Sequence, residues 1–277
     1  MRGTCNICGW KGEFLQPQFQ REGYLCGNCS ASSRHRAIVH VLGMVLGHGG
    51  PLFLWEADKS TVILESSARG PYPVMLDDKY DYYATEFDPA KIAAGTDPRH
   101  FADFQRLHYA DNTFDVVIAS EVFEHVRDDI AGYREIFRTL NETGALILTV
   151  PYNHDATETI RRVDTTGRED VHLLEPEYHG GGGHTLTYRN YGRDLLTLLA
   201  DTGFAVAHLA LDVQESGITP QSVILASRQP FLDLHERAPS LDHGRSLGAL
   251  LPFRMFLLFK YTIKGFAHYV RESGWKK

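Results

Sequence analysis

Cysteine is scarce in this sequence, and long apolar runs are absent. The chain has 277 residues but only four cysteines, all of them among the first 29 residues. No uncharged apolar stretch of about 18 residues occurs, so we expect no transmembrane helix. The N-terminal residues lack the hydrophobic run of a signal peptide. We therefore expect a cytoplasmic protein, in which disulfides are disfavoured.

Positive charge is scarce in the middle of the chain. The net charge is −7, yet residues 1–50 carry +3 and residues 245–277 carry +6, which leaves −16 for the middle. A nucleic-acid backbone favours clustered lysine and arginine. The acidic body therefore argues against a nucleic-acid partner. A polyanion or an anionic membrane would have to meet the two ends of the chain.

The four cysteines form two C-x2-C pairs, "CNIC" and "CGNC", separated by seventeen residues. Two such pairs can place four thiolates around one tetrahedral Zn²⁺, and four thiolates leave no open position for a substrate. We therefore predict a structural zinc site, and two disulfides are the alternative. The ligands would be Cys5, Cys8, Cys26 and Cys29.

Residues 1–48 are predicted to be a four-cysteine zinc module with a docking helix. Ser30, Ser32 and Ser33 offer N-caps, and apolar residues then recur at helical spacing. Arg34 and Arg36 permit RNA contact, but they suit a neighbour of a zinc–thiolate centre equally well.

Residues 49–230 alternate between strand and helix signals. The helix expected at 128–140 carries Ile130, Tyr133, Ile136 and Phe137 on one face. This alternation predicts an α/β sheet of mainly parallel strands, in which ligands bind at the carboxyl ends. Strands are expected at 61–65, 81–86, 114–119, 145–150, 204–211 and 222–227, with a weaker one at 100–104.

Acidic side chains follow four successive strands of this sheet. Glu86 can accept both hydroxyl hydrogens of a ribose, and Asp103 can accept from an exocyclic amine such as that of adenine. Glu65 and Glu121 end the other two strands. Each acid alone is readily explained as a solvated strand end, but the recurrence predicts a nucleoside-binding edge.

The runs "FADFQRLHYADNTFDVVIASEVFEHV", "YREIFRTLNETGALILTVP" and "LLTLLADTGFAV" resemble a class I S-adenosylmethionine-dependent methyltransferase over residues 60–228. The resemblance is closer to a bacterial subgroup that joins a four-cysteine N-terminal module to "EPEYHG" (175–180) and "YRNYG" (188–192). It implies a Rossmann-like sheet of seven strands with the last strand antiparallel. The implied cofactor contacts are Glu65, Ser67 and Gly70 on the methionine side, Glu86 and Phe87 at the ribose, Asp103 and Phe104 around the adenine, and Glu121 at the amino-acid end.

Glycine is scarce in the loop that this resemblance assigns to the cofactor. The family's acid-x-Gly-x-Gly pattern reads here as Glu-Ser-Ser-Ala-Arg-Gly over residues 65–70. Ser67 and Ala68 are small enough for a ligand to approach closely, whereas Arg69 is not. We expect an altered but serviceable loop. A non-catalytic binding protein that no longer holds the cofactor is the alternative.

Residues 152–191 are expected to be an insert that carries the substrate-side chemistry. Histidine titrates near neutral pH, so His179, His184 and His154 are, in that order, the candidate bases of an O-methyltransferase. A second metal site is an alternative use of the insert, and His125 is expected to be structural. That second site would consist of His172, Glu177, His179 and His184.

Residues 231–277 form a basic amphipathic tail. At helical spacing, residues 250–271 place lysine, histidine and arginine on one face and apolar side chains on the other, as in a membrane-surface helix. Packing on the body or on a second subunit is the alternative. The expected function is O-methylation of a sugar hydroxyl in a surface polysaccharide or a related small metabolite. An RNA methyltransferase that reads its target through the zinc module is the other enzyme hypothesis.

Overall fold

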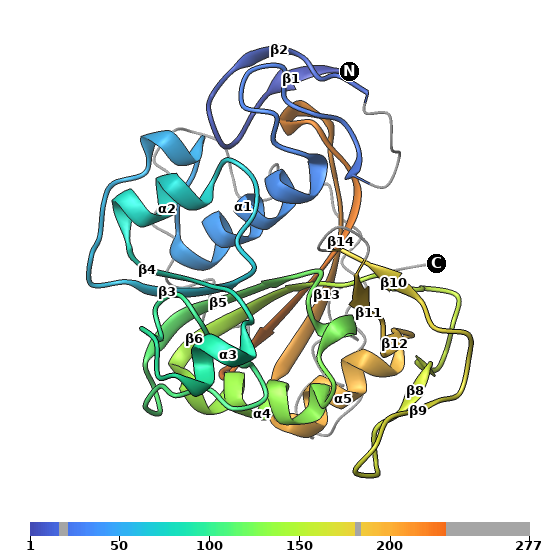
Figure 1. The fold of residues 1–277 in the computed structure, drawn as a ribbon. Helices are drawn as coiled ribbons and strands as arrows, with labels where there is room; N and C mark the ends of the chain where they lie inside the picture. Colours follow the sequence, from blue (N-terminus) through green and yellow to red (C-terminus); the bar gives the residue numbers. More distant parts are fainter. Residues whose placement is uncertain (17–21, 181–183, 231–277) are drawn as a thin grey trace, which may run out of the picture.

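A mixed six-stranded sheet forms the centre of the molecule (Figure 1). The structure is a computed structural model that describes residues 1–16, 22–180 and 184–230. The strand order is β13-β14-β6-β5-β3-β4, and β3 to β6 run parallel while β14 runs antiparallel to both of its neighbours. The expected mainly parallel sheet with an antiparallel last strand is therefore confirmed. The strands are β3 (Val62–Ser66), β4 (Asp81–Thr85), β5 (Phe114–Ser120), β6 (Leu140–Thr149), β13 (Ala205–Val213) and β14 (Ile218–Ser227).

The weak strand expected at 100–104 is not formed, so the described sheet has six strands and not seven. Phe101 makes only an isolated parallel bridge with Glu86, next to the end of β4. The carboxylate of Asp103 accepts the backbone N–H of Gln105 at 2.9 Å, which turns the chain away after this single bridge. The backbone at Glu86 is nevertheless fixed, because its N–H donates to the carbonyl of His100 at 2.9 Å.

Helices cover both faces of the sheet because successive strand residues point to opposite sides. Ile63 packs in one apolar cluster with α1 and α2, and Leu64 packs in a second cluster with α4 and α5. The helix expected at 128–140 is α4, so that prediction is confirmed to within one residue. The helices are α1 (Ser33–Leu46), α2 (Pro73–Lys79), α3 (Pro89–Ala93), α4 (Asp129–Thr139) and α5 (Asp194–Thr202), with 3-10 turns η2 (Leu52–Leu54), η3 (Phe123–His125) and η4 (Gln214–Ser216).

Helix α1 joins the four-cysteine module to the sheet. Ser32 is its N-cap and accepts the N–H of His35, which confirms the expected helix start. The guanidinium of Arg36 is fully buried and donates to the carbonyls of Tyr24 at 2.7 Å and Gly217 at 2.6 Å. Arg36 therefore connects the module to the β13–β14 hairpin and cannot contact RNA. The module itself contains β1 (Arg2–Thr4) paired with β2 (Lys11–Glu13).

The expected insert at 152–191 folds as short paired strands beside the sheet, in the yellow part of Figure 1. Three two-stranded pairs form, β12 with β7, β8 with β9, and β10 with β11. The strands are β7 (Ile160–Arg161), β8 (Val163–Asp164), β9 (Val171–His172), β10 (Tyr178–His179), β11 (Thr185–Leu186) and β12 (Arg189–Asn190).

The amphipathic tail at 231–277, with its proposed membrane-contacting part at 250–271, lies outside the described residues. Among the helices of the described part, none has the length and apolar character needed to cross a bilayer.

Candidate active site

The carboxyl ends of β3 and β5 meet where the strand order reverses. The chain runs from β3 outward to β4 and then returns to place β5 on the other side of β3, and ligands of open α/β sheets bind at such a reversal. Ser67 and Glu121 follow these two strands with φ of 52° and 54°, a left-handed conformation that is uncommon for residues other than glycine. Neighbouring strands hold both residues, because the N–H of Ser67 donates to Thr85 O at 2.7 Å and that of Glu121 to Thr149 O at 2.8 Å. Strained residues of this kind gather at binding sites.

Glu86 stands at the end of β4 with its carboxylate half-exposed, as a ribose ligand requires. The guanidinium of Arg69 lies 3.0 Å from this carboxylate and is itself largely exposed. The side chain that replaces a loop glycine therefore pairs with the expected ribose ligand. Because an exposed ion pair is weak, a ribose can displace Arg69 from Glu86. Phe87 is exposed beside Glu86 and offers an apolar surface next to it.

Asp103 and Phe104, the two residues expected around the adenine, differ in exposure. Asp103 is partly exposed, and its carboxylate accepts from the backbone and side-chain nitrogens of Gln105 at 2.9 and 3.1 Å. The ring of Phe104 is 4% exposed and packs edge-on against Phe123. Phe104 therefore supports this edge from within the core, while Asp103 remains at its surface.

Glu65 is buried beneath the loop and does not face the open side of the site. Its carboxylate is 1% exposed and accepts hydrogen bonds from the hydroxyls of Tyr72 and Tyr82. Burial raises the pKa of Glu65 to about 7, and the two tyrosine hydrogen bonds oppose that rise. In this structure Glu65 fixes the base of the loop through the two tyrosines.

Glu65→Gln is expected to flatten the pH dependence of unfolding. The pKa of Glu65 in the folded chain, about 7, exceeds its ordinary value of 4.5, so its contribution to stability is complete in acid and is lost as pH rises through this range. Between about pH 4 and about pH 8 the wild type should lose about 3 kcal/mol more unfolding free energy than the variant. Urea denaturation of both proteins at several pH values measures the difference. If the unfolding free energies of the two proteins changed with pH in parallel, the raised pKa of Glu65 would be contradicted.

Gly70 is required by the packing of α1. Its φ is +89°, and a Cβ added there would lie 2.6 Å from the ring of His35. Burial lowers the pKa of His35 to about 4, so this ring is neutral at pH 7. The one glycine left in the loop is therefore needed for contact with the docking helix, whatever its role toward a cofactor.

Arg34 connects the four-cysteine module to the same edge of the sheet. Its guanidinium lies 2.9 Å from the carboxylate of Glu22 and 3.3 Å from that of Glu121. Sequence reasoning considered Arg34 only for RNA or for the zinc centre and missed this contact. The sequence does place Arg34 in the first turn of a helix capped by Ser32. It does not reveal the contact with Glu121, because Glu121 follows β5 and is distant in the sequence.

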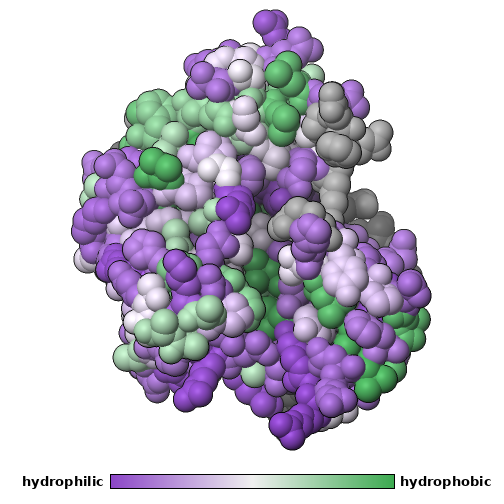
Figure 2. Space-filling view, viewed as in Figure 1, coloured by the Kyte–Doolittle hydropathy of each residue, from purple (hydrophilic) through white to green (hydrophobic). Residues whose placement is uncertain are grey.

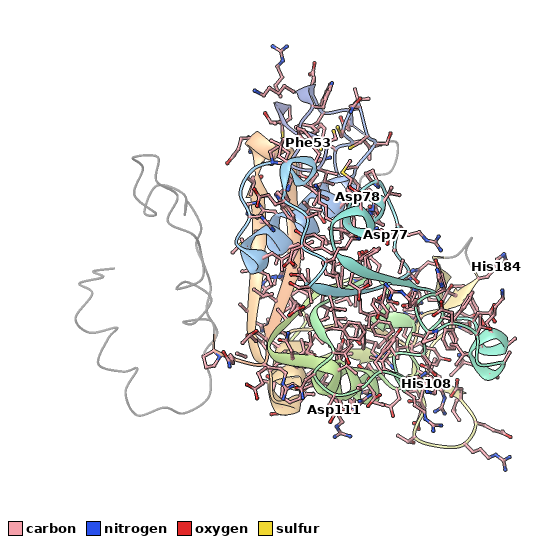
Figure 3. All side chains as sticks on the ribbon, turned by 90° about the vertical axis from the view of Figure 1, so that its left-hand side faces the viewer. Phe53, Asp77, Asp78, His108, Asp111 and His184 are labelled. Atoms are coloured by element: carbon pink, nitrogen blue, oxygen red, sulfur yellow. The ribbon has the colours of Figure 1, made fainter. Side chains whose placement is uncertain are left out.

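The structure separates the three histidines expected to act as bases. His179, on β10, lies beside His125, with ring centroids 4.6 Å apart. His184 is exposed at the outer side of the insert, as Figure 3 shows. His154 bonds to Ser222 at 2.8 Å and packs against His208, on the side of the sheet that carries β13 and β14. These three residues therefore do not form one constellation.

A buried arginine of the "YRNYG" segment orders the chain that follows β5. Arg189 is 1% exposed and donates to the carbonyls of Phe123, Val126 and Arg127 at 2.5 to 2.8 Å. Tyr191 reinforces this arrangement by donating to a carboxylate of Asp129 at 3.0 Å. Sequence reasoning singled out the segment but assigned Arg189 no role. Its role is to hold η3, and with it His125, in place.

The four cysteines come together in one cluster. Their Sγ atoms all lie within 4.8 Å of one another, with Cys5 and Cys29 3.9 Å apart and Cys8 and Cys26 3.7 Å apart. All four are free thiols, so the two-disulfide alternative is not what the structure shows. Four sulfurs about 2.3 Å from a tetrahedral Zn²⁺ would lie about 3.8 Å apart, so the cluster fits this ion.

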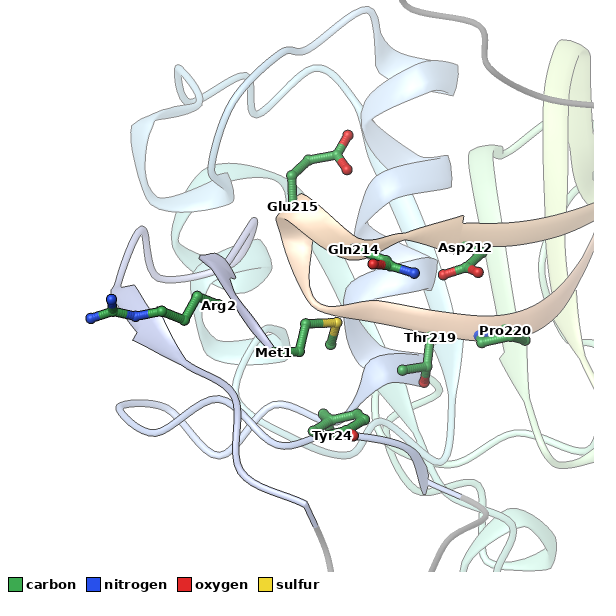
Figure 4. A pocket seen from close by; sticks show the side chains of 8 residues that line it. All are labelled: Met1, Arg2, Tyr24, Asp212, Gln214, Glu215, Thr219 and Pro220. Atoms are coloured by element: carbon green, nitrogen blue, oxygen red, sulfur yellow. The ribbon is translucent and has the colours of Figure 1, made fainter.

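Figure 2 shows a hollow in this face of the molecule, below the four-cysteine module. Helices α2 and α3 lie on one side of the hollow, and the insert lies on the other. Hydrophilic residues surround the hollow, and apolar atoms lie deeper inside. A separate pocket, shown in Figure 4, lies between the N-terminal strand and the β13–β14 hairpin. Its lining includes Met1, Tyr24 and Glu215 and none of the site residues expected from the sequence.

Comparison with known families gives one match. A family model described as a methyltransferase domain matches residues 70–148, which run from the end of the altered loop through β6. The chain is a methyltransferase. The matched stretch contains Glu86, Asp103 and Glu121. A comparison with curated proteins gave no match.

Solved structures similar to this methyltransferase share little sequence with it. One is the 1,6-didemethyltoxoflavin-N1-methyltransferase of Burkholderia thailandensis with bound S-adenosylhomocysteine, at 17% identity, 69% coverage of this chain and 76% of that chain, and a TM-score of 0.39. Another is an S-adenosylmethionine-dependent methyltransferase of Mesorhizobium loti, at 16% identity, 71% and 98% coverage, and a TM-score of 0.43. Likenesses this distant give no information on the methyl acceptor.

Proposed function

We propose that this methyltransferase transfers the methyl group of S-adenosylmethionine to a hydroxyl oxygen of a glycan or a small sugar metabolite. The observation that carries the proposal is the pair His125–His179 at the sheet edge that also presents Glu121. A hydroxyl needs help to lose its proton during methyl transfer, and histidine near neutral pH can accept it. His179 retains 28% exposure, so an acceptor can reach it.

The residues at the edge fit the cofactor. The half-exposed carboxylate of Glu86 suits the ribose, and Ser67 presents a small side chain in a conformation usually left to glycine. Asp103 is partly exposed and would accept from the adenine amine. When bound, S-adenosylmethionine supplies the electrophilic methyl group, and the protein aligns the acceptor oxygen with it.

We also propose that the four-cysteine cluster binds a structural Zn²⁺. The burial of Cys5 and Cys26 and the mutual distances of the four sulfurs support this assignment. The zinc would hold the two C-x2-C turns, and through them α1, Arg34 and Arg36, against the sheet.

A sugar acceptor agrees better with the charge distribution than RNA does. The acidic middle of the chain and the burial of Arg36 both disfavour a polyanionic substrate. We propose that the protein acts in the cytoplasm, on a glycan precursor. Contact of residues 250–271 with a membrane surface stays a prediction from the sequence.

Transfer of a labelled methyl group tests the function. Purified protein with methyl-labelled S-adenosylmethionine should label nucleotide sugars or surface polysaccharide, and the label should resist mild alkali because a sugar ether does not hydrolyse as an ester does. His179→Ala should lower the rate about 100-fold, as loss of a general base does. His108→Ala, an exposed histidine that Figure 3 shows apart from His184, is the matched control and should retain full activity. Label confined to RNA would overturn the proposal.

A further inference from the structure

The insert brings His179 to two residues that lie far from it in the sequence, Glu124 and His125. One ligand atom from each of the three side chains lies within 4.8 Å of the others. Among the described residues, the only other such group is the four-cysteine cluster. The set expected from the sequence is not assembled, because His172 lies on β9, exposed, and joins no such group in the described chain.

We propose that Glu124, His125 and His179 bind a divalent transition-metal ion at the mouth of the acceptor site. Two imidazoles and one carboxylate are a ligand set typical of zinc, iron and related ions, and three protein ligands leave positions open for a substrate oxygen. The arrangement is slightly expanded, since His125 Nε2 and Glu124 Oε1 are 3.7 Å apart. Ligands about 2.1 Å from a shared ion lie roughly 3.0 to 3.5 Å apart, so binding needs each donor to move by about 1 Å or less.

The hydrogen bonds of His125 direct one ring nitrogen toward the cluster. Its Nδ1 lies 2.8 Å from the carbonyl oxygen of Leu186, and a carbonyl can only accept. Nδ1 therefore carries a proton, so that in the neutral ring Nε2, on the side of Glu124, is the nitrogen able to bind an ion. A metal-binding histidine usually donates a hydrogen bond from its other ring nitrogen, often to a backbone carbonyl, and this bond fixes the orientation of the ring.

Backbone hydrogen bonds fix the two segments that carry the three ligands. The N–H of Tyr188 donates to the carbonyl of Glu124 at 2.8 Å, and the N–H of Thr187 donates to that of Glu177 at 2.8 Å. Register between β10 and β11 places His179 opposite Thr185. The ligands are therefore held before any ion binds, which lowers the conformational cost of binding.

The carboxylate of Glu124 is in a setting where a cation binds strongly. Glu124 is 1% exposed and His125 12% exposed, so the attraction between carboxylate and ion is little screened by water. His179 is the most exposed of the three, which gives an ion and an acceptor a way in.

The position of the cluster suggests what the ion does. Glu121, at the expected cofactor end, precedes Glu124 by three residues. With the ion bound, His179 would serve as its ligand and not as the base, and an acceptor hydroxyl on the ion would release its proton to water more readily. Its oxygen then forms the O–C bond while the C–S bond of the sulfonium breaks and its electron pair stays on sulfur. This role rests on the proposed oxygen methylation, whereas the metal site itself does not.

Metal content tests the site without reference to activity. After equilibration with Zn²⁺ and removal of loosely bound ions, the full chain should retain two zinc ions, and Glu124→Gln and His179→Ala should each retain one. His172→Ala, the matched control, should retain two. Mn²⁺ avoids thiolate sites, so its paramagnetic resonance spectrum should report one bound ion in the wild type and an affinity lower by about 100-fold or more in Glu124→Gln.

One zinc ion in the wild type, with no bound Mn²⁺, would overturn the metal site. Loss of one zinc ion in His172→Ala, with two retained in Glu124→Gln, would overturn the ligand assignment. Because the counts need neither cofactor nor acceptor, they stand even if the proposed sugar methylation fails. If the wild type holds two ions but labels no sugar, the site is retained and the proposed function is rejected.

Discussion

Cys26→Ser is expected to lose the proposed structural zinc and to unfold at a much lower temperature than the wild type. Cys26 is 2% exposed and belongs to the same apolar cluster as α1 and one face of the sheet. A serine hydroxyl does not replace a thiolate toward zinc, and metal binding is coupled to folding. A loss of more than about 5 kcal/mol would lower the melting temperature by about 10 to 20 °C.

Zinc analysis and thermal denaturation monitored by circular dichroism measure this effect. Lys11→Ala is the control, since Lys11 is exposed on β2 of the same module and offers no thiolate. It should keep its zinc and its melting temperature. If the Cys26→Ser protein contained no zinc but had the same melting temperature as the wild type, the cluster would not stabilise the fold.

Glu86→Ala is expected to weaken binding of S-adenosylhomocysteine by about 30-fold, from loss of about 2 kcal/mol in charge-assisted hydrogen bonds to the ribose. The carboxylate is half-exposed at the end of β4, and its backbone is fixed by the bridge to Phe101. Truncation should therefore leave the fold unchanged. Glu142→Ala, an exposed glutamate on β6, is the matched control and should bind as the wild type does.

Arg69→Ala separates two explanations of the altered loop. If Arg69 only competes with the ribose for Glu86, its removal should leave the affinity equal or higher. Titration calorimetry of the three variants gives the comparison. Unchanged binding in Glu86→Ala would exclude the ribose role of Glu86, and weaker binding in Arg69→Ala would mean that Arg69 contacts the cofactor directly.

Local patterns in the sequence were sufficient for the central sheet and for the cysteine cluster. Runs of β-branched and aliphatic residues such as 114–119 become buried strands, and a repeated C-x2-C motif brings its thiols together, because both depend on neighbours in sequence. The weakly signalled strand at 100–104 failed because Asp103 turns the chain after one bridge.

The directions in which the site's side chains point could not be predicted, because they depend on contacts between segments distant in the sequence. The two-residue period of a strand places Glu65 on the same face as Ile63, toward α1, but only the fold shows that Tyr72 and Tyr82 hold its carboxylate there. Gly70 likewise looks like the remnant of a cofactor loop until the ring of His35 is seen against it.

The meeting of His125 with His179 could not be read from the sequence either. It follows from the backbone bond between Tyr188 and Glu124 and from the buried Arg189, whose partners are carbonyls of the segment after β5. Carbonyl partners leave no trace in residue type, so the sequence pattern offered no sign of the role of Arg189.

Titration of the zinc-loaded wild-type protein with S-adenosylhomocysteine tests most directly whether this edge of the sheet is a working cofactor site. Ser67, Glu86 and Glu121 at the carboxyl ends of β3, β4 and β5 predict one equivalent bound with micromolar affinity. No heat of binding and no thermal stabilisation, from a protein shown to be folded, would contradict that site.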